Sequence, residues 1–433
     1  MSPPTVPLGR LAEVRVSNVD KKTAEGERPV RLCNYTDVYY SDVIRDDRVF
    51  MAATATAAQV ERFRLKAGDT LITKDSETAE DIAAASYVAG SARDLLCGYH
   101  LAIIRPYDGA VEPRFLAWAT RSDFLREQLA AEATGVTRFG LRYDTILRAR
   151  VPTPPPEIQR RVANFLDDQV ARINEIIRLR EAQAEAIGRR STAAIDAVVT
   201  GSGLQSVSES QWRPFREVPR GWSETRLRRL RCLVQTGPFG SQLHSDEYIG
   251  VGGWPVVNPA GIAEDGLRAV PGMSIPGEVR TRLARHVLRA GDIVFGRRGD
   301  LGRAGIVTEA ESGWVCGTGS LLVRLSDPRL RPEYLVRLLR ARALKSYFEM
   351  QSVGSTMDNL NTEILLGMPL FVPPVDVQQD ITSEADRIDE NRFALTAEMT
   401  LQVELLRERK RSLITAAVTG EFDVSAASGR GVA

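Results

Sequence analysis

One long uninterrupted segment constrains the fold of this chain more than any other feature. Residues 157–199 contain no proline and a single glycine, whereas Pro155 and Pro156 precede them and Gly201 follows. Proline lacks the N–H that a helix interior needs and glycine readily ends a helix, so these residues fit a helix start and stop. The predicted helix is about 43 residues and ~65 Å long, which is typical of a coiled-coil arm. Its apolar or small residues recur at steps of three and four and share one face; they are Leu166, Val170, Ile173, Ile177, Ala184, Ile187, Ala194 and Val198.

The same segment occurs a second time. A spacing of 219 residues separates Pro154 from Pro373, and it also separates Val199 from Val418. Two long amphipathic helices in one chain can bury their apolar faces against each other, whereas neither would be stable alone in water. The second helix carries apolar or small residues at Val377, Ile381, Ala385, Ile388, Leu395, Met399, Leu406, Leu413 and Ala417. Its register is left open, because three polar residues interrupt the stripe, namely Arg392, Gln402 and Lys410.

The repeat extends upstream of both helices. Short strands bounded by Gly, Asp and Pro come first in each half, and helical segments expected over residues 113–133 and 332–350 follow them. Strands followed by helices favour an α+β unit in each half, so the expected fold class is α+β with two homologous units and two long helices. The matching segments are Cys97-Gly98 with Cys316-Gly317, residues 102–105 with 321–324 and, at an offset of 223, residues 67–69 with 290–292.

These patterns predict the boundaries along the chain. We expect a first globular unit, a first long helix, a linker, a second globular unit, a second long helix and a disordered tail. Their expected ranges are, in that order, residues 1–150, 151–201, 202–220, 221–370, 371–423 and 424–433.

Composition bounds the compartment and the class of protein. The 433 residues are 43% hydrophobic and 26% charged, which is ordinary for a soluble globular protein. The sequence contains no run of 18 apolar residues of the kind that predicts a membrane span. The four cysteines form no C-x-x-C pair, which favours a reducing cytoplasm and disfavours a structural zinc site. The net charge of +1 does not by itself indicate a nucleic-acid binder.

Motifs that carry catalysis are missing from the sequence. The chain has no G-x-x-x-x-G-K-[ST] loop for nucleotide phosphates, and its three histidines fall outside any H-E-x-x-H pattern. We therefore expect a binding protein with no catalytic residues, no metal and no cofactor. Two alternatives stay open: a self-sufficient enzyme such as a nuclease, and a coiled-coil scaffold that binds proteins without sequence-specific DNA binding.

Both long helices carry the same motifs at their ends. The first begins Pro155-Pro156-Glu157-Ile158-Gln159 and ends Val198-Val199-Thr200-Gly201, while the second begins Pro373-Pro374-Val375-Asp376-Val377-Gln378 and ends Ala417-Val418-Thr419-Gly420. Residues 218–222, 237–241, 291–302 and 135–141 belong to the same pattern. Over essentially its whole length, this arrangement resembles the specificity subunit of type I restriction–modification systems. One departure is that Arg387-Ile388-Asp389 lies four residues earlier than Arg172-Ile173-Asn174 predicts, so side chains in mid-helix need not correspond.

The resemblance implies a division of labour. Each globular unit would be a target recognition domain that reads one half of a split, asymmetric site in double-stranded DNA. The two helices would form an antiparallel coiled coil that spaces these domains and docks two methyltransferase subunits. Motor–nuclease subunits would join in the restricting complex, and the specificity subunit itself would have no active site.

Eleven residues are the candidate DNA contacts. Lys74 and Arg297 match at an offset of 223, and a glycine-rich loop at residues 296–305 lets the backbone approach a phosphate. A solvated turn is the alternative for that loop. The loops before the long helices favour phosphate contacts, and the segment after Gly237-Pro238-Phe239-Gly240 offers candidate base readers, for which a capped turn is the alternative. The candidates are Lys74, Thr137, Arg138, Ser241, Gln242, His244, Arg297, Arg298, Arg303, Ser355 and Thr356.

Overall fold

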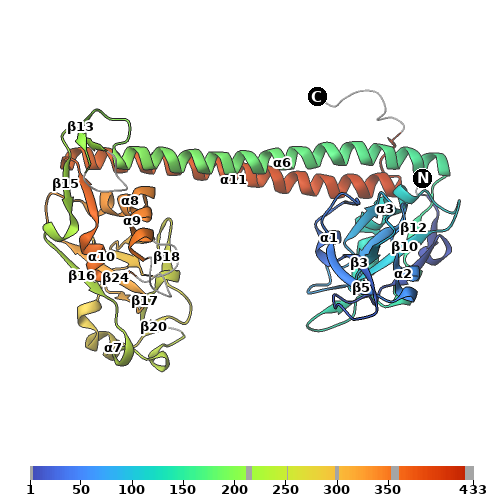
Figure 1. Cartoon of the computed structure of the whole chain (residues 1–433), viewed down its shortest axis with the longest axis horizontal. Helices are drawn as coiled ribbons and strands as arrows, with labels where there is room; N and C mark the ends of the chain where they lie inside the picture. Colours follow the sequence, from blue (N-terminus) through green and yellow to red (C-terminus); the bar gives the residue numbers. More distant parts are fainter. Residues whose placement is uncertain (1–2, 211–216, 251, 298–301, 353–359, 425–433) are drawn as a thin grey trace. The chain divides into compact units, whose positions relative to one another are not determined.

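The computed structural model describes residues 3–210, 217–250, 252–297, 302–352 and 360–424. The chain forms two compact units, the first made of Met1–Ala182 with Met399–Ala433 and the second of Gln183–Glu398. Each unit therefore contains one globular part and one end of each long helix (Figure 1). In the described parts of the chain, no helix is long and apolar enough to cross a membrane.

Two helices of equal length dominate the chain. Helix α6 spans Pro156–Thr200 and helix α11 spans Val375–Thr419, with 45 residues in each. Each follows a proline pair and ends before a glycine with a left-handed backbone, Gly201 at φ 69° and Gly420 at φ 77°. A residue with a Cβ is strained at such φ values, so glycine fits both helix ends.

The two helices pack against each other in both units. In the first unit, Leu166 and Val170 of α6 share a core with Ile414 and Ala417 of α11. In the second unit, Val199 near the end of α6 shares a core with Ile381 and Ala385 near the start of α11. The start of one helix thus meets the end of the other, so the pair is antiparallel (Figure 1). The expected fold class, α+β with two long helices in contact, is confirmed.

The polar residues that interrupt the α11 stripe have their own partners. Lys410 donates to Asp42 Oδ2 at 2.8 Å and to Asn174 Oδ1 of α6 at 3.0 Å, within the first unit. In the second unit, Arg392 forms ion pairs with Asp389 and Glu264. These cations therefore connect the helix pair to the globular parts instead of breaking the seam.

Two sheets of three or more strands form the described globular part of the first unit, beside two two-stranded sheets, β1-β12 and β11-β7. A five-stranded sheet has the order β2-β10-β6-β8-β4, and a three-stranded sheet has the order β5-β3-β9, in which β3 and β9 run parallel. The sheet strands are β2 (Ala12–Val16), β3 (Arg28–Cys33), β4 (Val43–Ile44), β5 (Met51–Ala55), β6 (Thr70–Thr73), β8 (Ala85–Val88), β9 (Leu95–Cys97) and β10 (Leu101–Pro106). Around them lie β1 (Thr5–Pro7), α1 (Tyr35–Tyr39), α2 (Ala57–Phe63), β7 (Asp75–Ser76), α3 (Pro113–Arg121), α4 (Asp123–Ala131), β11 (Phe139–Gly140), α5 (Tyr143–Arg148) and β12 (Arg150–Pro152).

The second unit repeats this plan. Its four-stranded sheet has the order β16-β24-β21-β22, so β16-β24-β21 corresponds to β2-β10-β6, and the parallel pair β17-β23 corresponds to β3-β9. The sheet strands are β16 (Cys232–Thr236), β17 (Trp254–Val257), β20 (Ser274–Ile275), β21 (Ile293–Gly296), β22 (Ala304–Ile306), β23 (Val315–Cys316) and β24 (Ser320–Leu325). The remaining elements include β13 (Ser206–Glu209), β14 (Glu217–Pro219), β15 (Ser223–Arg226), β18 (Ile262–Ala263), β19 (Gly266–Leu267), α7 (Gly277–Arg282), α8 (Pro332–Arg340), α9 (Arg342–Ser352), α10 (Thr362–Gly367) and β25 (Pro369–Val372).

Two details differ from the sequence-based expectation. Each expected helical segment is two helices, α3 and α4 separated at Ser122, and α8 and α9 separated at Ala341. Both separating residues are extended, with ψ of 146° and 144°, so the helical hydrogen bonds stop there. At the other end of the chain, Val424 is buried in the core of the first unit, although we expected a disordered tail to begin there. Residues 425–433 lie outside the described residues.

The glutamine of each helix-start motif has a structural role. Gln159 accepts a hydrogen bond from the Glu112 N–H at 2.8 Å and donates to the Pro154 carbonyl at 2.8 Å. In the second unit, the equivalent Gln378 accepts from the Arg331 N–H at 2.8 Å and donates to the Pro373 carbonyl at 2.8 Å. Both side chains are buried. Each glutamine thus ties the start of a long helix to the start of α3 or α8.

The correspondence between the long helices holds as far as Asp167 and Asp386. Asp167 of α6 accepts a hydrogen bond from Trp118 Nε1 of α3 at 2.8 Å, and Asp386 of α11 pairs with Arg337 of α8. All four residues obey the 219-residue spacing. Beyond this point the side-chain contacts of the two helices no longer correspond. Asn174 of α6 contacts Asp42 and Lys410, in agreement with the four-residue displacement of Arg387-Ile388-Asp389 in α11.

Candidate nucleic-acid interface

Lys74 and Arg297 occupy equivalent backbone positions in the two units. The Lys74 N–H donates to the His100 carbonyl at 3.0 Å, and the Lys74 carbonyl accepts from the Leu141 N–H at 2.8 Å. The Arg297 N–H donates to the Gly319 carbonyl at 2.9 Å, and the Arg297 carbonyl accepts from the Leu360 N–H at 3.1 Å. Each residue therefore connects the strand before it, β6 or β21, to the segment that precedes a long helix.

The Lys74 side chain is half-buried beside an aromatic ring. Its Nζ lies 4.4 Å from the centre of the Tyr99 ring and 3.4 Å from the Ser17 carbonyl oxygen. Burial lowers the pKa of Lys74, and the neighbouring Asp75 carboxylate opposes that shift. Such a cation above a half-exposed tyrosine face is held in place and still borders solvent.

Arg138 and His100 meet on one carboxylate. Arg138 donates to Asp75 Oδ1 from Nε at 3.0 Å and from Nη2 at 2.6 Å, while His100 Nδ1 lies 2.9 Å from Asp75 Oδ2. The Asp75 side chain is 16% exposed, whereas that of Arg138 is 53% exposed. The carboxylate thus fixes a guanidinium group that faces solvent. The structure brings together two of the predicted contacts, Lys74 and Arg138.

A closed loop presents Thr137 and Arg138. Thr134 and Gly140 exchange two backbone hydrogen bonds, of 3.1 and 2.9 Å, which close the five intervening residues, 135–139, into a compact turn. A Cβ at Gly135, where φ is 152°, would lie 1.9 Å from the Arg138 carbonyl oxygen. Only glycine fits this position, so the loop has one defined path. Thr137 is exposed at its tip.

An open groove lies beside this cluster. It has a volume of about 660 Å³ and is lined by Glu13, Arg15, Arg62, Lys74 and Tyr143, among other residues. Arg15 pairs with Glu13 at 2.7 Å and also donates to the Arg62 carbonyl at 2.8 Å. The groove therefore carries cationic side chains along the edge strand β2, next to Lys74.

The predicted readers Ser241, Gln242 and His244 form a turn in the second unit. Gln242 Oε1 accepts from the Phe239 N–H at 3.3 Å, and Glu247 accepts from the His244 N–H at 2.8 Å. Ser241 and His244 are exposed. The capped-turn alternative describes their local structure, and their contact with DNA stays a prediction.

Arg297 and Arg303 flank a hairpin formed by β21 and β22, in which Phe295 pairs with Ala304. Arg297 Nε donates to the Leu360 carbonyl at 2.9 Å, and Arg303 Nη1 donates to the Pro259 carbonyl at 3.3 Å. Three further predicted contacts, Arg298, Ser355 and Thr356, lie outside the described residues.

Arg303 also borders a cationic pocket that sequence reasoning missed. The pocket has a volume of about 530 Å³, and its lining includes Arg337, Arg340, Lys345 and Arg392. Arg340 donates to backbone carbonyls, including those of Glu264 and Ala304, each at 2.6 Å. Burial lowers the pKa of Arg340, and neighbouring Arg337 lowers it further. No signal in the sequence pointed to this site, because its cations come from four separate segments.

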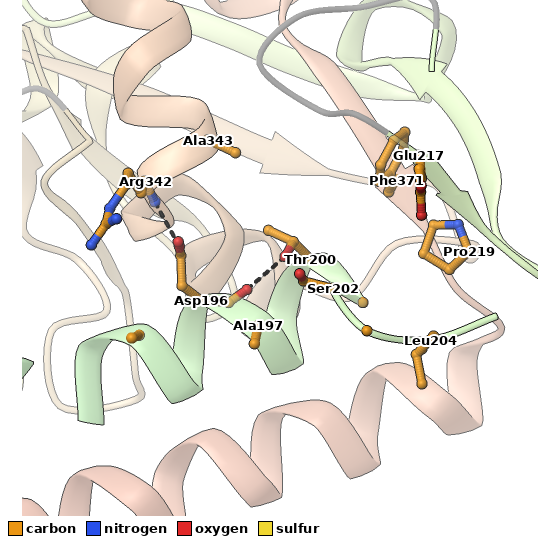
Figure 2. A pocket seen from close by; sticks show the side chains of 13 residues that line it. Asp196, Ala197, Thr200, Ser202, Leu204, Glu217, Pro219, Arg342, Ala343 and Phe371 are labelled. Carbon is orange, nitrogen blue, oxygen red and sulfur yellow. Dashed lines mark hydrogen bonds between the residues drawn. The ribbon is translucent and has the colours of Figure 1, made fainter. Parts of the chain in front are cut away.

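A third pocket, of about 510 Å³, lies where the chain leaves α6 (Figure 2). Asp196 accepts from the Arg342 N–H at 2.7 Å, and its carbonyl accepts from Thr200 Oγ1 at 2.7 Å (Figure 2). Asp196 thereby satisfies the first N–H of α9, so it joins two helices. Among the described residues, no group of three or more His, Cys, Asp or Glu side chains is arranged to hold a metal ion.

Sequence reasoning also missed part of the first cluster. Asp75 and Tyr99 were not singled out, and His100 entered only as one of three histidines outside any H-E-x-x-H pattern. A signal was present, because Asp75 directly follows Lys74, and Tyr99-His100 directly follows the repeated Cys-Gly pair.

Known proteins are similar to this chain in one stretch of sequence and in the overall fold. Residues 242–405 match the family described as type I restriction modification DNA specificity domain. A chain from a study of complex assembly and conformational transition of the type I R-M system is 20% identical, with a TM-score of 0.71 over 97% of this chain and 98% of that one. The HsdS subunit from Thermoanaerobacter tengcongensis is 19% identical, with a TM-score of 0.53 over 97% of each chain. Residues 242–405 thus match a type I restriction modification DNA specificity domain, and the fold of the two similar structures extends over both halves of this chain.

Proposed function

We propose that each globular unit reads one half of a bipartite, asymmetric site in double-stranded DNA. The observation that supports this most directly is the equivalence of Lys74 and Arg297, which place a cation at the same backbone position of two units. Cations at matched positions suit phosphates that recur along the duplex, while side chains that differ between the units can read different bases.

The paired helices serve as a spacer in this proposal. A helix of 45 residues is ~68 Å long at a rise of about 1.5 Å per residue. One turn of B-DNA is about 34 Å, so such an arm suits two half-sites on one face of the duplex with unread base pairs between them.

The proposed partners rest on the similarity to type I specificity subunits. We propose that the helix pair docks two methyltransferase subunits, and that motor–nuclease subunits join them in the restricting complex. A similar chain comes from a study of complex assembly in the type I R-M system, which supports this proposal. The cytoplasm is the proposed compartment, and the four cysteines are free thiols in the structure.

The proposal is tested with the chain purified together with its methyltransferase subunits. The complex should select one bipartite sequence from a random duplex library, and its affinity should fall steeply as salt rises because bound phosphates release counterions. Binding without sequence preference, or no duplex binding, would contradict the proposal and favour a scaffold that binds only proteins.

A further inference from the structure

The internal repeat supplies a comparison between two readers built on the same backbone. The equivalence of Lys74 and Arg297 aligns their hydrogen-bond partners, so that His100 corresponds to Gly319. By the same spacings, Tyr99 corresponds to Thr318, Asp75 to Arg298 and Arg138 to Met357 in sequence. Of the cluster around Asp75, only the cation at position 74 therefore has a counterpart of the same chemistry in the second half.

Some residues that stabilise the fold are the same in the two halves, unlike the residues of the Asp75 cluster. Gln159 and Gln378 are the same residue type and make two equivalent hydrogen bonds in their units, and Gln378 also donates to the Arg329 carbonyl. The backbone hydrogen bonds of Lys74 recur at Arg297, where the sequence lacks the residues of the Asp75 cluster. The backbone conformation at this position therefore does not depend on the cluster. Two domains that read different half-sites must differ where they touch bases, which makes the Asp75 cluster a candidate reading position.

The geometry of Arg138 suits one base in particular. Asp75 Oδ1 accepts from Nε and from one N–H of Nη2, and Nη1 has no hydrogen-bond partner within the part of the chain that the structure describes. Nη2 also lies 3.5 Å from His100 Nδ1, but this nitrogen donates to Asp75 Oδ2, so the second N–H of Nη2 stays available. The remaining edge of the guanidinium group, with N–H donors on Nη1 and Nη2, matches the O6 and N7 acceptors of guanine in the major groove. Because Asp75 is held in turn by His100, the guanidinium group loses little freedom on binding.

We propose that Arg138 reads a guanine in the half-site of the first unit, and that Asp75 is the residue that positions it. This inference rests on the proposed function and adds a specific reader and base. It also replaces the phosphate contact expected for Arg138 from the sequence. Thr137, at the exposed tip of the same loop, has a matching Thr356 in the second half and keeps the expected phosphate role.

The test uses the complex of the full chain with its methyltransferase subunits and a random duplex library. The wild-type consensus is determined first, and every single base-pair variant of it is then measured with Arg138→Ala and Arg138→Met. Discrimination at one G·C pair of the first half-site should fall by about 5- to 150-fold, which is the range for one bidentate contact. Preferences in the second half-site should not change. Arg148→Ala is the matched control, because Arg148 is an exposed arginine paired with Asp144 in the same unit.

Asp75→Asn separates positioning from a general structural role. This change removes a negative charge, so affinity for unrelated DNA should stay the same or rise while discrimination at the same G·C pair falls. Damage to the fold would instead lower affinity for all sequences.

Equal weakening on every sequence by Arg138→Ala would show a phosphate contact and overturn the inference, and so would an unchanged preference at every position. A wild-type complex without any sequence preference would overturn the proposed function itself, and this inference with it.

Discussion

Arg105 holds both carboxylate oxygens of Asp69, with Nε 2.7 Å from Oδ1 and Nη2 2.6 Å from Oδ2. The Asp69 side chain is 1% exposed, and its Oδ2 also accepts from the Lys66 N–H at 2.8 Å. The second unit has the same joint between Arg324 and Asp292, although the two aspartates are offset by 223 residues and the two arginines by 219. Each ion pair ties the turn before β6 or β21 to the neighbouring strand β10 or β24, so the units share a buried ion pair as well as a topology.

Arg105→Ala should destabilise the first unit by about 3 kcal/mol, because it leaves the Asp69 carboxylate buried without its charged partner. The measurement is hydrogen exchange of β6 and β10 amides, or urea unfolding followed in the first unit. Arg148→Ala is the control, since it breaks an exposed ion pair and should cost at most about 1 kcal/mol. Equal effects of the two substitutions would contradict this account.

Gln378→Ala should expose the start of α8 to hydrogen exchange. The substitution removes the Gln378 partner of the Arg331 N–H and of the Arg329 and Pro373 carbonyls, and each such buried loss costs about 1–3 kcal/mol. Gln379→Ala is the matched control, because Gln379 is exposed and makes one contact of 3.3 Å with Arg331. If both variants exchange at the wild-type rate, the motif glutamine does not act as a tie.

Acid should weaken the attachment of Asp42 to the helix pair. Burial opposes ionisation of Asp42, but Arg121 and Lys410, with hydrogen bonds from Lys410 and Asn174, lower its pKa to about 2. A lowered pKa means that the stabilising contribution is complete above the unfolded value, near 3.8, and is lost as the pH falls towards 2. Asp42→Asn should therefore flatten the loss of thermal stability between about pH 4 and 2 in the first unit. An unchanged pH profile would show that the contact contributes nothing.

Lengthening both helices should lengthen the unread spacer of the DNA target. Seven residues inserted after Ala182 and seven before Met399 add ~10 Å to each helix while nearly preserving the packed face. The spacer should grow by up to about 3 base pairs, with both half-site sequences unchanged. The methylation pattern of a host that carries the variant measures this directly, and a four-residue insertion that rotates the packed face serves as the comparison. A spacer of unchanged length would refute the role of the helices as a spacer.

Several features of the candidate site could not be read from the sequence. The match of Lys74 with Arg297 followed from the repeat, since both are fixed by their distance from a Gly-Asp pair. The meeting of Arg138, Asp75 and His100 did not follow, because it depends on loops that bring segments 25 and 63 residues apart onto one carboxylate. The break of α3 and α4 at Ser122 was also missed, because no proline or glycine marks it.

The sequence by itself determined the two helices, their repeat and the α+β class, because periodicity, proline and glycine act through local geometry. Only the tertiary structure decided the partners of the charged residues. In the sequence, Lys410 only interrupts an apolar stripe. In the structure it donates a hydrogen bond to Asp42, which lies 368 residues away in the sequence. A charged side chain that is excluded from water is stable only with a partner of opposite sign. The tertiary fold decides which residue is that partner, because it brings together residues that are far apart in the sequence.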